Sequence, residues 1–539
     1  MSRKYFSKEK SQKSSSSDSL AHSSKNKTVV GASLVKESSI SRSAHIVSGI
    51  RTLTIQNIVN SVLGFVFLTL LLRLLSPSEY GLFTSVSLVT GIGSSIAFFG
   101  LQYAATRFVA FTAHDENESR MVSRSIVVLS VIFASCATVV FVLLSPTISL
   151  YFTDSAEAAW VFAAAGAWLF SGTISGIFQG LVQGMKKYES LAKVLMIANL
   201  GMVLVTVIGL EQFNSIIVPI FAWVFYGAVI SVWSLSITSK PLPVSNSSET
   251  SNQTLNRILK YSLPLGIAGI LTVITGAGDP IIVGGFLSQA QLGEYFVAIA
   301  ISGGLGVILF TPLNTAFFPE TASDARDPKR LSEGLRLAFR YTLFALIPVS
   351  FALAGLSTQV IKLFSGSSPS YFAADFPLQL MSVFFLFVAM QGILTSLLLS
   401  TGKTKQVMLI AAVTVVLDLG LSVLLVPNFG LLGATTSRIL VDIAGFLVAL
   451  YLTRNYLRGV ADLKFQAKLF ITSIILFAVL SSLSTFISDR VLTLVPYSII
   501  AGIILLLCAR GMKLLTEEDR KHLERVIPPR FSKLVLSLI

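Results

Sequence analysis

"LLSPSEYGLF" (residues 74–83) is a short polar stretch between two long apolar ones, and "FLSQAQLGEYF" (residues 286–296) is a second version of it far along the chain. In the first copy Pro77 and Gly81 supply turn chemistry, because proline presets φ and glycine accepts conformations that other residues avoid. Each copy therefore predicts a reversal of the chain between two apolar helices.

Residues 75–126 align with residues 287–338 without a gap, through apolar, polar and turn positions alike. Shared apolar composition explains matches between apolar residues, but it explains matches between Ser, Gly, Asp and Arg poorly. We therefore interpret the two segments as copies of one repeated unit. Identical pairs include Leu75/Leu287, Ser76/Ser288, Gly81/Gly293, Gly91/Gly303, Phe98/Phe310, Leu101/Leu313, Asp115/Asp327 and Arg124/Arg336.

The composition of the 539-residue chain is typical of an integral membrane protein. Hydrophobic residues make up 53% and charged residues only 13%, whereas soluble domains carry about 25% charged residues. The formal net charge is +14, which in a soluble chain would suggest nucleic-acid binding. In a membrane protein the excess is expected in cytoplasmic loops, so no nucleic-acid partner is predicted.

Long apolar segments account for most of the chain. A transmembrane helix needs about 20 mostly apolar residues, and breaks at charges, Pro and Gly divide the sequence into about fourteen such segments. The first twelve divide into two sets of six. Because six is an even number, both sets enter the membrane from the same side, so they are parallel repeats. We predict an all-α polytopic membrane protein of two parallel six-helix repeats plus an accessory C-terminal helix pair. The predicted spans are 48–74, 80–110, 122–145, 157–184, 189–209, 214–238, 258–286, 292–320, 334–363, 373–400, 405–426, 430–453, 466–487 and 491–512.

The segments outside these spans are short or of low complexity. The N-terminal stretch is rich in Ser and Lys, and such a composition cannot bury enough apolar surface to fold. None is long enough for a catalytic domain, so the chain is not expected to be an enzyme, and no catalytic residue, cofactor or metal site is predicted. The predicted organisation is a disordered basic cytoplasmic tail (1–45), a first repeat (46–238), a cytoplasmic linker (239–256), a second repeat (257–455), accessory helices 13 and 14 (464–512) and a cytoplasmic tail (513–539).

The distribution of Lys and Arg predicts the orientation, because cytoplasmic loops are enriched in both. With the amino terminus inside, the predicted inner loops and helix ends hold nearly all of these residues outside the tails, including Arg120, Lys186, Lys187 and Lys403. The predicted outer loops and helix ends hold only Arg73, Lys362 and Arg490. We therefore predict a multi-pass protein of the plasma membrane with both termini in the cytoplasm.

Three motifs give the chain a family resemblance. "LLSPSEYGLFTSVSLVTGIGSSIAFFGLQYAATRFVA" (74–110), "FQGLVQGMKKYE" (178–189) and "LTEEDRKHLERVIPP" (515–529) resemble segments of the polysaccharide-transporter branch of the multidrug/oligosaccharidyl-lipid/polysaccharide exporter superfamily. The resemblance implies a flippase that moves lipid-linked oligosaccharide, a polyprenyl phosphate or pyrophosphate glycan, from the inner to the outer leaflet by alternating access. Such a flippase serves the assembly of cell-surface polysaccharide or glycoprotein.

The resemblance also implies partners and leaves rival functions open. The implied partners are the lipid-linked oligosaccharide, membrane lipids, and glycosyltransferases or a polymerase or ligase of the same pathway. The alternative within the superfamily is a cation-coupled exporter of drugs or other small molecules, which would need an acidic or aromatic cleft. A membrane-bound glycan polymerase or glycosyltransferase is disfavoured, because the predicted outer loops are short.

Polar residues along the first span are candidates for substrate binding. Arg51, Gln56, Asn57 and Asn60 lie there, and Gln56 and Asn60 are four residues apart, so they share one helix face. Arg suits phosphate, and amides suit sugar hydroxyls. Alternatively, Arg51 extends to the inner headgroups and the amides join neighbouring helices.

Three further arginines are candidates for the same role, because charges within spans are expensive and usually functional. Arg73 either releases a headgroup at the outer side or pairs with Glu79. Arg107 either faces inner phosphates or extends to the membrane surface. Arg438 either binds substrate or forms an ion pair within its own helix with Asp442, four residues later; the ion pair is the favoured interpretation.

Asp279 is the strongest candidate for ion coupling. It precedes Pro280 inside a predicted span, and proline removes a helical hydrogen bond and so frees a carbonyl for a cation. Thr414 and Asp418 share a face of a later span. In the related lipid II flippases a sodium site joins an aspartate of span seven to residues of span eleven, and the resemblance implies the same set here, Asp279, Thr414 and Asp418, coupled to Na⁺ or H⁺. The alternative is a structural Asp279 paired with an arginine or with backbone.

Overall fold

A computed structural model describes most of the chain between Ile55 and Phe486. The predicted tails, Arg51 and most of the last predicted span lie outside the described residues. Those described are 55–112, 115–239, 251–311, 313–314, 328–366, 369–457, 460, 462–486, 497, 500–504, 507 and 510.

All regular structure in the described residues is helical, and twelve of the helices are long and apolar enough to cross a membrane. The predicted all-α polytopic membrane fold is therefore confirmed, with helix bounds close to the predicted spans. The helices are Ile55–Leu74, α2 Pro77–Phe98, α3 Leu101–Phe111, α4 Glu116–Thr153, α5 Ala159–Gly184, α6 Tyr188–Phe213, α7 Ile217–Ser239, α8 Ser251–Phe286, α9 Gln289–Leu305, η1 Gly306–Phe310, α11 Pro328–Gly355, α12 Ser357–Ser365, η3 Pro369–Ala374, α13 Asp375–Ser400, α14 Thr404–Thr453 and α15 Leu463–Phe486.

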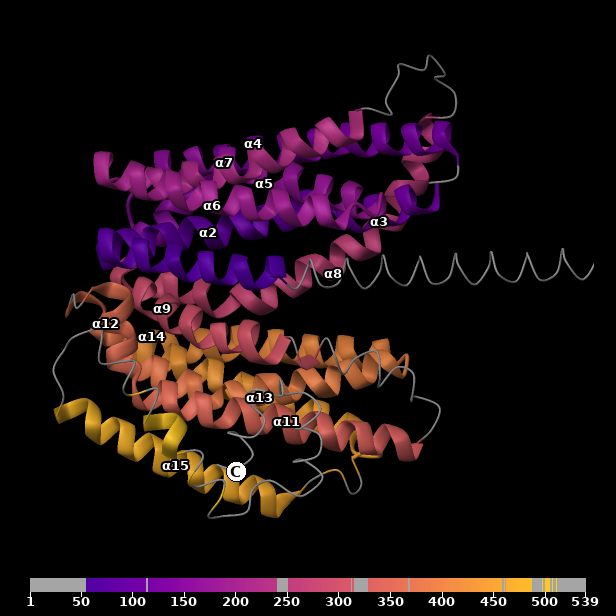
Figure 1. Ribbon diagram of the computed structural model, residues 1–539. Coiled ribbons are helices and arrows are strands. Elements are labelled where there is room, and N and C mark those ends of the chain that lie inside the picture. Colours follow the sequence, from indigo (N-terminus) through magenta and orange to yellow (C-terminus); the bar gives the residue numbers. More distant parts are fainter. Residues whose placement is uncertain are drawn as a thin grey trace, which may run out of the picture.

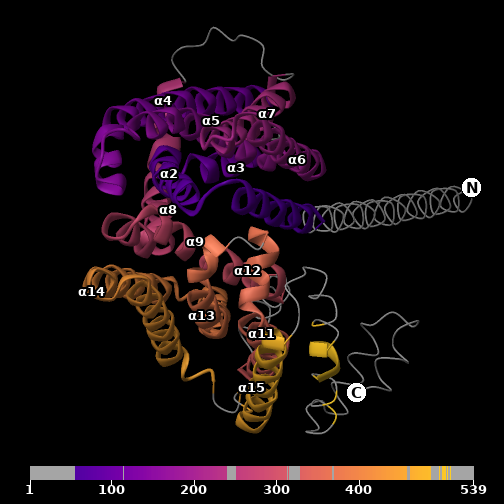
Figure 2. The same cartoon turned by 90° about the vertical axis from the view of Figure 1, so that its left-hand side faces the viewer.

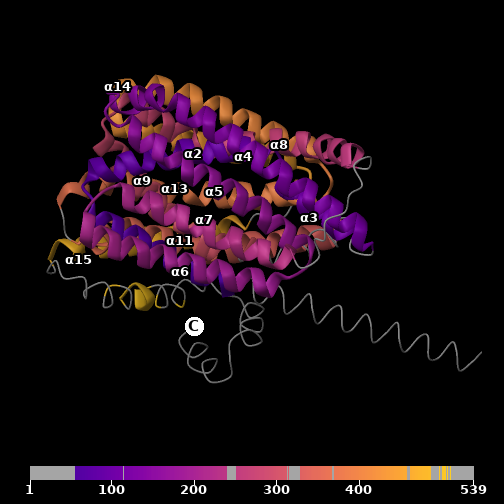
Figure 3. The ribbon, with the colours of Figure 1, turned by 90° about the horizontal axis from the view of Figure 1, so that it is seen from above.

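The helices form two lobes, visible one above the other in Figure 1 and from the side in Figure 2. The first lobe holds the helix Ile55–Leu74 and α2 to α7. The second holds α9 to α14, with α15 packed against α11. Seen from above, the long helices of both lobes run side by side along a common direction (Figure 3). The first lobe covers most of the range predicted as the first repeat, and the second lobe together with α8 covers most of the range predicted as the second.

The repeated turn forms the start of α2 in one lobe and of α9 in the other. Ser76 caps α2 by accepting a hydrogen bond from the backbone N–H of Glu79, whose side chain accepts one from the backbone of Ser76. Ser288 and Gln291 form the same capping box at α9. We call the end of the bundle that carries these two caps the turn end.

Gly81 has a different role from the predicted one, because it lies inside α2 and not in the turn. A Cβ atom at Gly81 would collide with the backbone carbonyl of Gln289, and one at Gly293 would lie 3.1 Å from the backbone nitrogen of Gly81. The two glycines therefore allow α2 and α9 to approach closely where the lobes meet. Pro77 does belong to the turn, at the first position of α2.

Several predicted boundaries differ from the observed ones, among them those of the second, eleventh and twelfth spans. The predicted span 80–110 is interrupted at Phe99 and Gly100, both with positive φ, because Gly100 packs against the backbone of α8, where a Cβ atom would collide with the carbonyl of Ser262. The predicted spans 405–426 and 430–453 are continuous in α14 apart from a reversal at Gly430, with φ of 58°.

The two halves of α14 fold back on each other after that reversal. The hydroxyls of Ser422 and Ser437 lie 3.0 Å apart across the pair, and a Cβ atom at Gly445 would lie 2.8 Å from the side chain of Thr414. The predicted eleventh and twelfth spans are thus an antiparallel helix pair.

Helix α8 connects the lobes. It begins at Ser251, inside the range 239–256 that was predicted as a linker, and contains Pro264 and Pro280. Its first half packs on the first lobe, where Ile258 joins the core around α3 to α5. Its second half packs on α14. This course places Asp279 against α9 and α14 of the second lobe, whereas the carbonyl of Ile281, two residues later, accepts a hydrogen bond from Tyr151 on α4 of the first lobe.

Candidate functional site

A cavity of about 550 Å³ lies in the second lobe between α8, α9, α13 and α14. Its walls combine aromatic and aliphatic side chains with a few polar ones, which is the usual make-up of a small-molecule site. The polar side chains that line it are Thr275, Ser302, Asn314, Gln391, Thr395, Ser396, Thr414, Asp418, Arg438 and Asp442.

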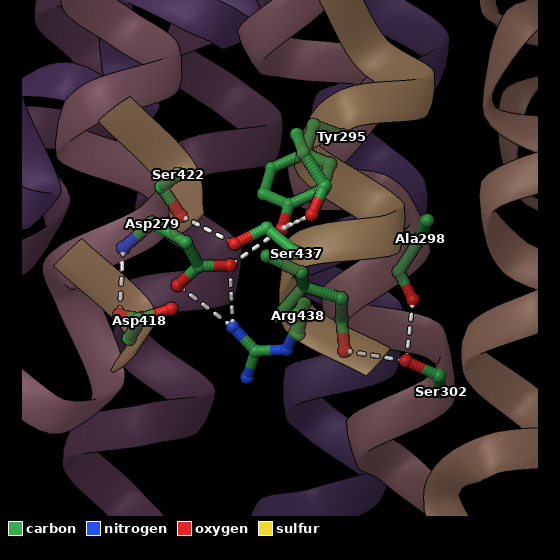
Figure 4. A network of polar contacts seen from close by, with 10 residues as sticks. Asp279, Tyr295, Ala298, Ser302, Asp418, Ser422, Ser437 and Arg438 are labelled. Atoms are coloured by element: carbon green, nitrogen blue, oxygen red, sulfur yellow. Dashed lines mark hydrogen bonds and ion pairs between the residues drawn. The ribbon is translucent and has the colours of Figure 1, made fainter. Parts of the chain in front are cut away.

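An ion pair between α8 and α14 lies at the edge of this cavity, which Arg438 lines. The Nη1 atom of Arg438 donates to both carboxylate oxygens of Asp279, at 2.9 and 2.8 Å. The Tyr295 hydroxyl donates to the same carboxylate, as Figure 4 shows. The Asp279 side chain is 1% exposed and that of Arg438 is 28% exposed. Asp279 is therefore enclosed by protein, and Arg438 is the partner of the pair that a ligand in the cavity can reach.

The pairing of Arg438 corrects the favoured prediction of an ion pair with Asp442. Although Asp442 is one helical turn away, Arg438 bonds to Asp279 on α8. A carboxylate that is almost fully buried needs an opposite charge more than a half-buried one does. Asp279 is thus paired with an arginine, the partner named in the alternative to ion coupling.

Asp279 and Asp418 are brought together by the shape of α8. The backbone N–H of Asp279 donates to Oδ2 of Asp418 at 3.2 Å. Gly278 makes this approach possible, because a Cβ atom there would lie 2.5 Å from the same oxygen. Pro280 follows directly and removes one backbone donor from this turn of α8, next to the turn that bonds to α14.

Thr414 lies on the same face of α14 as Asp418, and both side chains are buried and line the cavity. The Thr414 hydroxyl donates to the carbonyls of Ile410 and Ala411 in its own helix. The three predicted ion-coupling residues thus share one region, in which Asp279, Asp418 and Asp442 surround a single guanidinium among the described side chains.

The predicted polar face of the first helix lies away from this cavity. Gln56 is buried and Asn60 half-buried, whereas Asn57 is exposed. The Oδ1 atom of Asn60 is buried and has no hydrogen-bond partner among the described residues. Gln56 and Asn60 therefore face inward together, as their spacing predicted, but neither lines the second-lobe cavity.

Arg73 and Arg107 lie at opposite ends of the bundle. Arg73 donates to the carbonyl of Leu363 at 2.9 Å, a bond between the lobes at the turn end, so the predicted pair with Glu79 is wrong. Glu79 instead closes the cap of α2. Arg107 is exposed at the other end, with its guanidinium 4.4 Å from the ring of Tyr261.

Sequence reasoning missed Tyr295, although it lies in the repeated stretch. Its counterpart in the ungapped alignment is Phe83, so at this position the second copy has a hydroxyl that the first copy lacks. That hydroxyl is buried and bonds to Asp279. Comparing the two copies position by position would have singled out this hydroxyl, although not its acceptor.

The structure resembles several solved transporters. It superposes on lipid II flippase MurJ in an inward closed conformation with a TM-score of 0.70 and 16% identity, over 85% of this chain and 97% of that one. A multidrug resistance MATE family transporter of the MOP superfamily matches in its inward-facing conformation with a TM-score of 0.57 and 15% identity, over 76% of this chain and 98% of that one. At these identities the likeness shows a shared fold.

Two comparisons of sequence point to glycan assembly. The probable low-salt glycan biosynthesis flippase Agl15 of Haloferax volcanii is 24% identical over 250 residues. The match covers 44% of this chain, and it spans about half of the archaeal protein, 49%. The profile of the family described as "Polysaccharide biosynthesis protein" matches residues 70–370. This match includes both copies of the repeated turn and more than half of the chain, so the protein belongs to the polysaccharide biosynthesis protein family and has the fold of the MOP superfamily.

Proposed function

We propose that this protein is a flippase that moves lipid-linked oligosaccharide from the inner to the outer leaflet of the plasma membrane by alternating access. The observation that carries the proposal is the free edge of Arg438. Only Nη1 bonds to Asp279, and among the described residues nothing bonds to Nη2 or Nε. Figure 4 shows that this edge points away from the carboxylate.

A phosphate group fits that edge. A guanidinium presents its donors in a planar fork that suits phosphate, and a charge in a partly dry cavity binds more strongly than one in water. Beyond Arg438 the cavity offers the amides of Gln391 and Asn314 and the hydroxyl of Ser396. These are the groups that would accept and donate hydrogen bonds to a polyhydroxylated headgroup.

The comparisons support this assignment. The archaeal relative is named a glycan biosynthesis flippase, and the superposed MurJ is named a lipid II flippase. MATE family transporters with this fold have been captured in inward-facing and in outward-facing conformations. A two-lobe protein with this fold suits the same alternation, with both termini in the cytoplasm as the charge distribution predicts.

A second candidate is a cation-coupled exporter of drugs or other small molecules. The observation that favours it is the presence of Asp418 and Asp442 in the same cavity wall. Two carboxylates beside one guanidinium would attract a lipophilic cation as well as a metal ion. The MATE neighbours share the fold and include multidrug transporters.

We propose that coupling to Na⁺ or H⁺ runs through Asp279, Thr414 and Asp418. Asp279 is held by Arg438, so Asp418 is the member whose carboxylate can exchange its partner with the least rearrangement. Gln56 and Asn60 on the inward face of the first helix, together with Arg51 and with Asn57 on its exposed side, would offer polar groups to the substrate. Arg107 and Arg73 would attract the headgroup at the two ends of the path.

The test is a leaflet assay in proteoliposomes with polyprenyl-linked glycans on one side. We expect the wild-type protein to accelerate their transfer and Arg438→Gln to reduce the rate by at least tenfold. Arg454→Gln is the matched control, because Arg454 is exposed and its guanidinium lies 4.3 Å from the ring of Tyr451, away from the cavity lining. Export of ethidium without any transfer of glycan lipid would contradict the proposal and favour the second candidate.

A further inference from the structure

A second, smaller cavity lies in the first lobe, apart from the site described above. Its volume is about 280 Å³, and it lies between α2, α3, α5 and α7. Its wall includes Trp168, Trp223, Tyr226, Gln102 and Gln179. A volume at the low end of ligand sites suits a single small ring better than a whole oligosaccharide.

The two cavities are the same site in the two repeats. Phe98 and Gln102 line the first-lobe cavity, and in the ungapped alignment they correspond to Phe310 and Asn314, which line the second. Each phenylalanine ring packs against a glycine of the facing helix. A Cβ atom at Gly176 on α5 would lie 2.6 Å from the Phe98 ring, and one at the glycine facing Phe310, Gly392 on α13, would collide with that ring.

The two copies of the site have diverged in charge. The second-lobe cavity contains an arginine and two aspartates, whereas the described lining of the first-lobe cavity contains no charged side chain. Aromatic rings line the first-lobe cavity where charged side chains line the second. Trp168 and Trp223 lie parallel with centroids 5.3 Å apart, and Tyr226 meets Trp223 edge-on at 5.4 Å. Trp168 also stacks on Phe83, with ring centroids 5.9 Å apart, so these packed rings have little freedom to turn.

The amides of the first-lobe cavity are free. Gln102 and Gln179 are half-buried, and neither side chain makes a hydrogen bond to any residue that the structure describes. Ring packing alone would explain an apolar core, whereas two accessible, unbonded amides beside the rings give this cavity polar groups that a ligand can reach. Aromatic rings against C–H groups, combined with amides that both donate and accept, are the chemistry that recognises a neutral sugar ring.

We infer that the first-lobe cavity is a sugar-binding subsite, complementary to the phosphate-binding edge of Arg438 in the second lobe. The inference rests on the proposed function, because it assigns one part of that substrate to each lobe. A neutral hexose or N-acetylhexosamine would lie against the indole of Trp223 and bond to Gln102 and Gln179. The charged copy of the site serves the headgroup phosphate, and the uncharged copy serves the glycan.

The test compares ligands with and without a sugar on the full chain in nanodiscs. The probes are undecaprenyl phosphate and its phosphodiesters with one glucose, galactose or N-acetylglucosamine. We expect at least one glycosylated probe to bind more tightly than the bare lipid. In Gln179→Ala and Trp223→Phe this gain should fall by about tenfold, the effect of one or two lost hydrogen bonds or contacts. Affinity for the bare lipid should stay within twofold, which also shows that the variants are folded.

Controls of the same residue types lie outside the cavity. Gln183→Ala changes an amide one turn along α5, and Trp233→Phe changes an indole further along α7. Both should retain the gain from the sugar, whereas Arg438→Gln should weaken the binding of every probe. If no probe binds at all, the proposed function itself fails.

Two outcomes would overturn the sugar subsite while leaving the flippase intact. One is binding of all probes with no gain from any sugar. The other is a gain that survives Gln179→Ala and Trp223→Phe unchanged. Loss of tetraphenylphosphonium binding in Trp223→Phe, with no effect on the sugar probes, would show instead that the rings form a site for cations.

Discussion

Gly81 and Gly293 occupy equivalent positions in the two repeats and contact each other where α2 crosses α9. A Cβ atom at Gly293 would lie 3.4 Å from the Cα atom of Gly81. Close to this crossing the Ser85 hydroxyl donates to the side chain of Gln289 at 2.9 Å. The Tyr371 hydroxyl donates to the carbonyl of Leu75 at 3.0 Å. The lobes are therefore joined at the turn end by backbone contact and by bonds between repeats.

Gly81→Ala should separate the lobes at the turn end. The added methyl collides with the carbonyl of Gln289, a backbone atom that cannot rotate away, so overpacking should cost about 1–3 kcal/mol. In a background without Cys136 and Cys508, Ser85→Cys should react faster with an impermeant maleimide when Gly81 is alanine. Ser85 is fully buried in the unchanged packing, so a slow reaction is the expected baseline.

The matched control is Gly91→Ala in the same helix, because nothing lies within 4 Å of a Cβ atom there. It should leave the melting temperature and the labelling rate unchanged or slightly raise the stability. Equal labelling of Ser85→Cys in all three backgrounds would show that α2 and α9 do not close this end.

Asp279→Asn should destabilise the protein by breaking the ion pair with Arg438. Removing one partner of a buried pair costs about 3–5 kcal/mol, and we expect about 2–3 kcal/mol here because Arg438 is 28% exposed. Adding Arg438→Gln should recover part of the loss, since the double variant leaves no unpaired charge. Thermal unfolding in detergent measures the stability of Asp279→Asn, of Arg438→Gln and of the double variant.

The control for this comparison of single and double variants is the ion pair of Glu189 and Lys193. Its carboxylate oxygen and Nζ atom are 2.9 Å apart, and both side chains are largely exposed. Glu189→Gln should produce no measurable change, because exposed ion pairs contribute little. A double variant of Asp279 and Arg438 whose loss equals the sum of the single losses would show that the two residues do not stabilise each other.

Asp418→Asn should remove the dependence of transport on an ion gradient if coupling runs through this carboxylate. The assay is glycan-lipid transfer in proteoliposomes under Na⁺ and pH gradients, applied one at a time. Asp154→Asn is the control, because Asp154 is exposed and has a φ of 52°, which asparagine accepts. Gradient dependence that persists in Asp418→Asn would exclude this residue from coupling.

Arg107→Gln should slow capture of an anionic lipid headgroup without unfolding the protein. The guanidinium is exposed, and its contact with Tyr261 is of a kind that contributes about 0.5–1 kcal/mol. We expect the rate of undecaprenyl phosphate binding to fall by a few fold at low salt and the difference to shrink at high salt. Lys362→Gln, which changes a cation at the turn end, should leave that rate unchanged.

The helices and the repeat were predictable because both are local properties. Twenty apolar residues in a row predict a crossing wherever they occur, and most predicted spans match observed helices. The caps of α2 and α9 follow from Ser76 and Ser288 with an acceptor three residues later. The break at Gly100 was missed, because the glycine is needed for contact with α8 and not for the conformation of its own helix.

The candidate residues were easier to find than their partners. Asp279, Asp418 and Arg438 were recognised because charges within apolar spans are rare. The sequence offered Asp442 as the neighbour of Arg438, yet burial of Asp279 on α8 decided the pairing. Tyr295 was missed because an aromatic residue in an apolar span gives no local sign that its hydroxyl has a buried acceptor.

The sequence by itself determined a membrane protein of two related halves, because hydropathy and repetition are written along the chain. Only the tertiary structure decided what the repeated stretch is for. Gly81 and Gly293 prove to be the contact between lobes, and the equivalent cavities prove to differ in charge. The physical reason is that close approach, burial and ion pairing depend on residues from distant helices, whose positions no local pattern specifies.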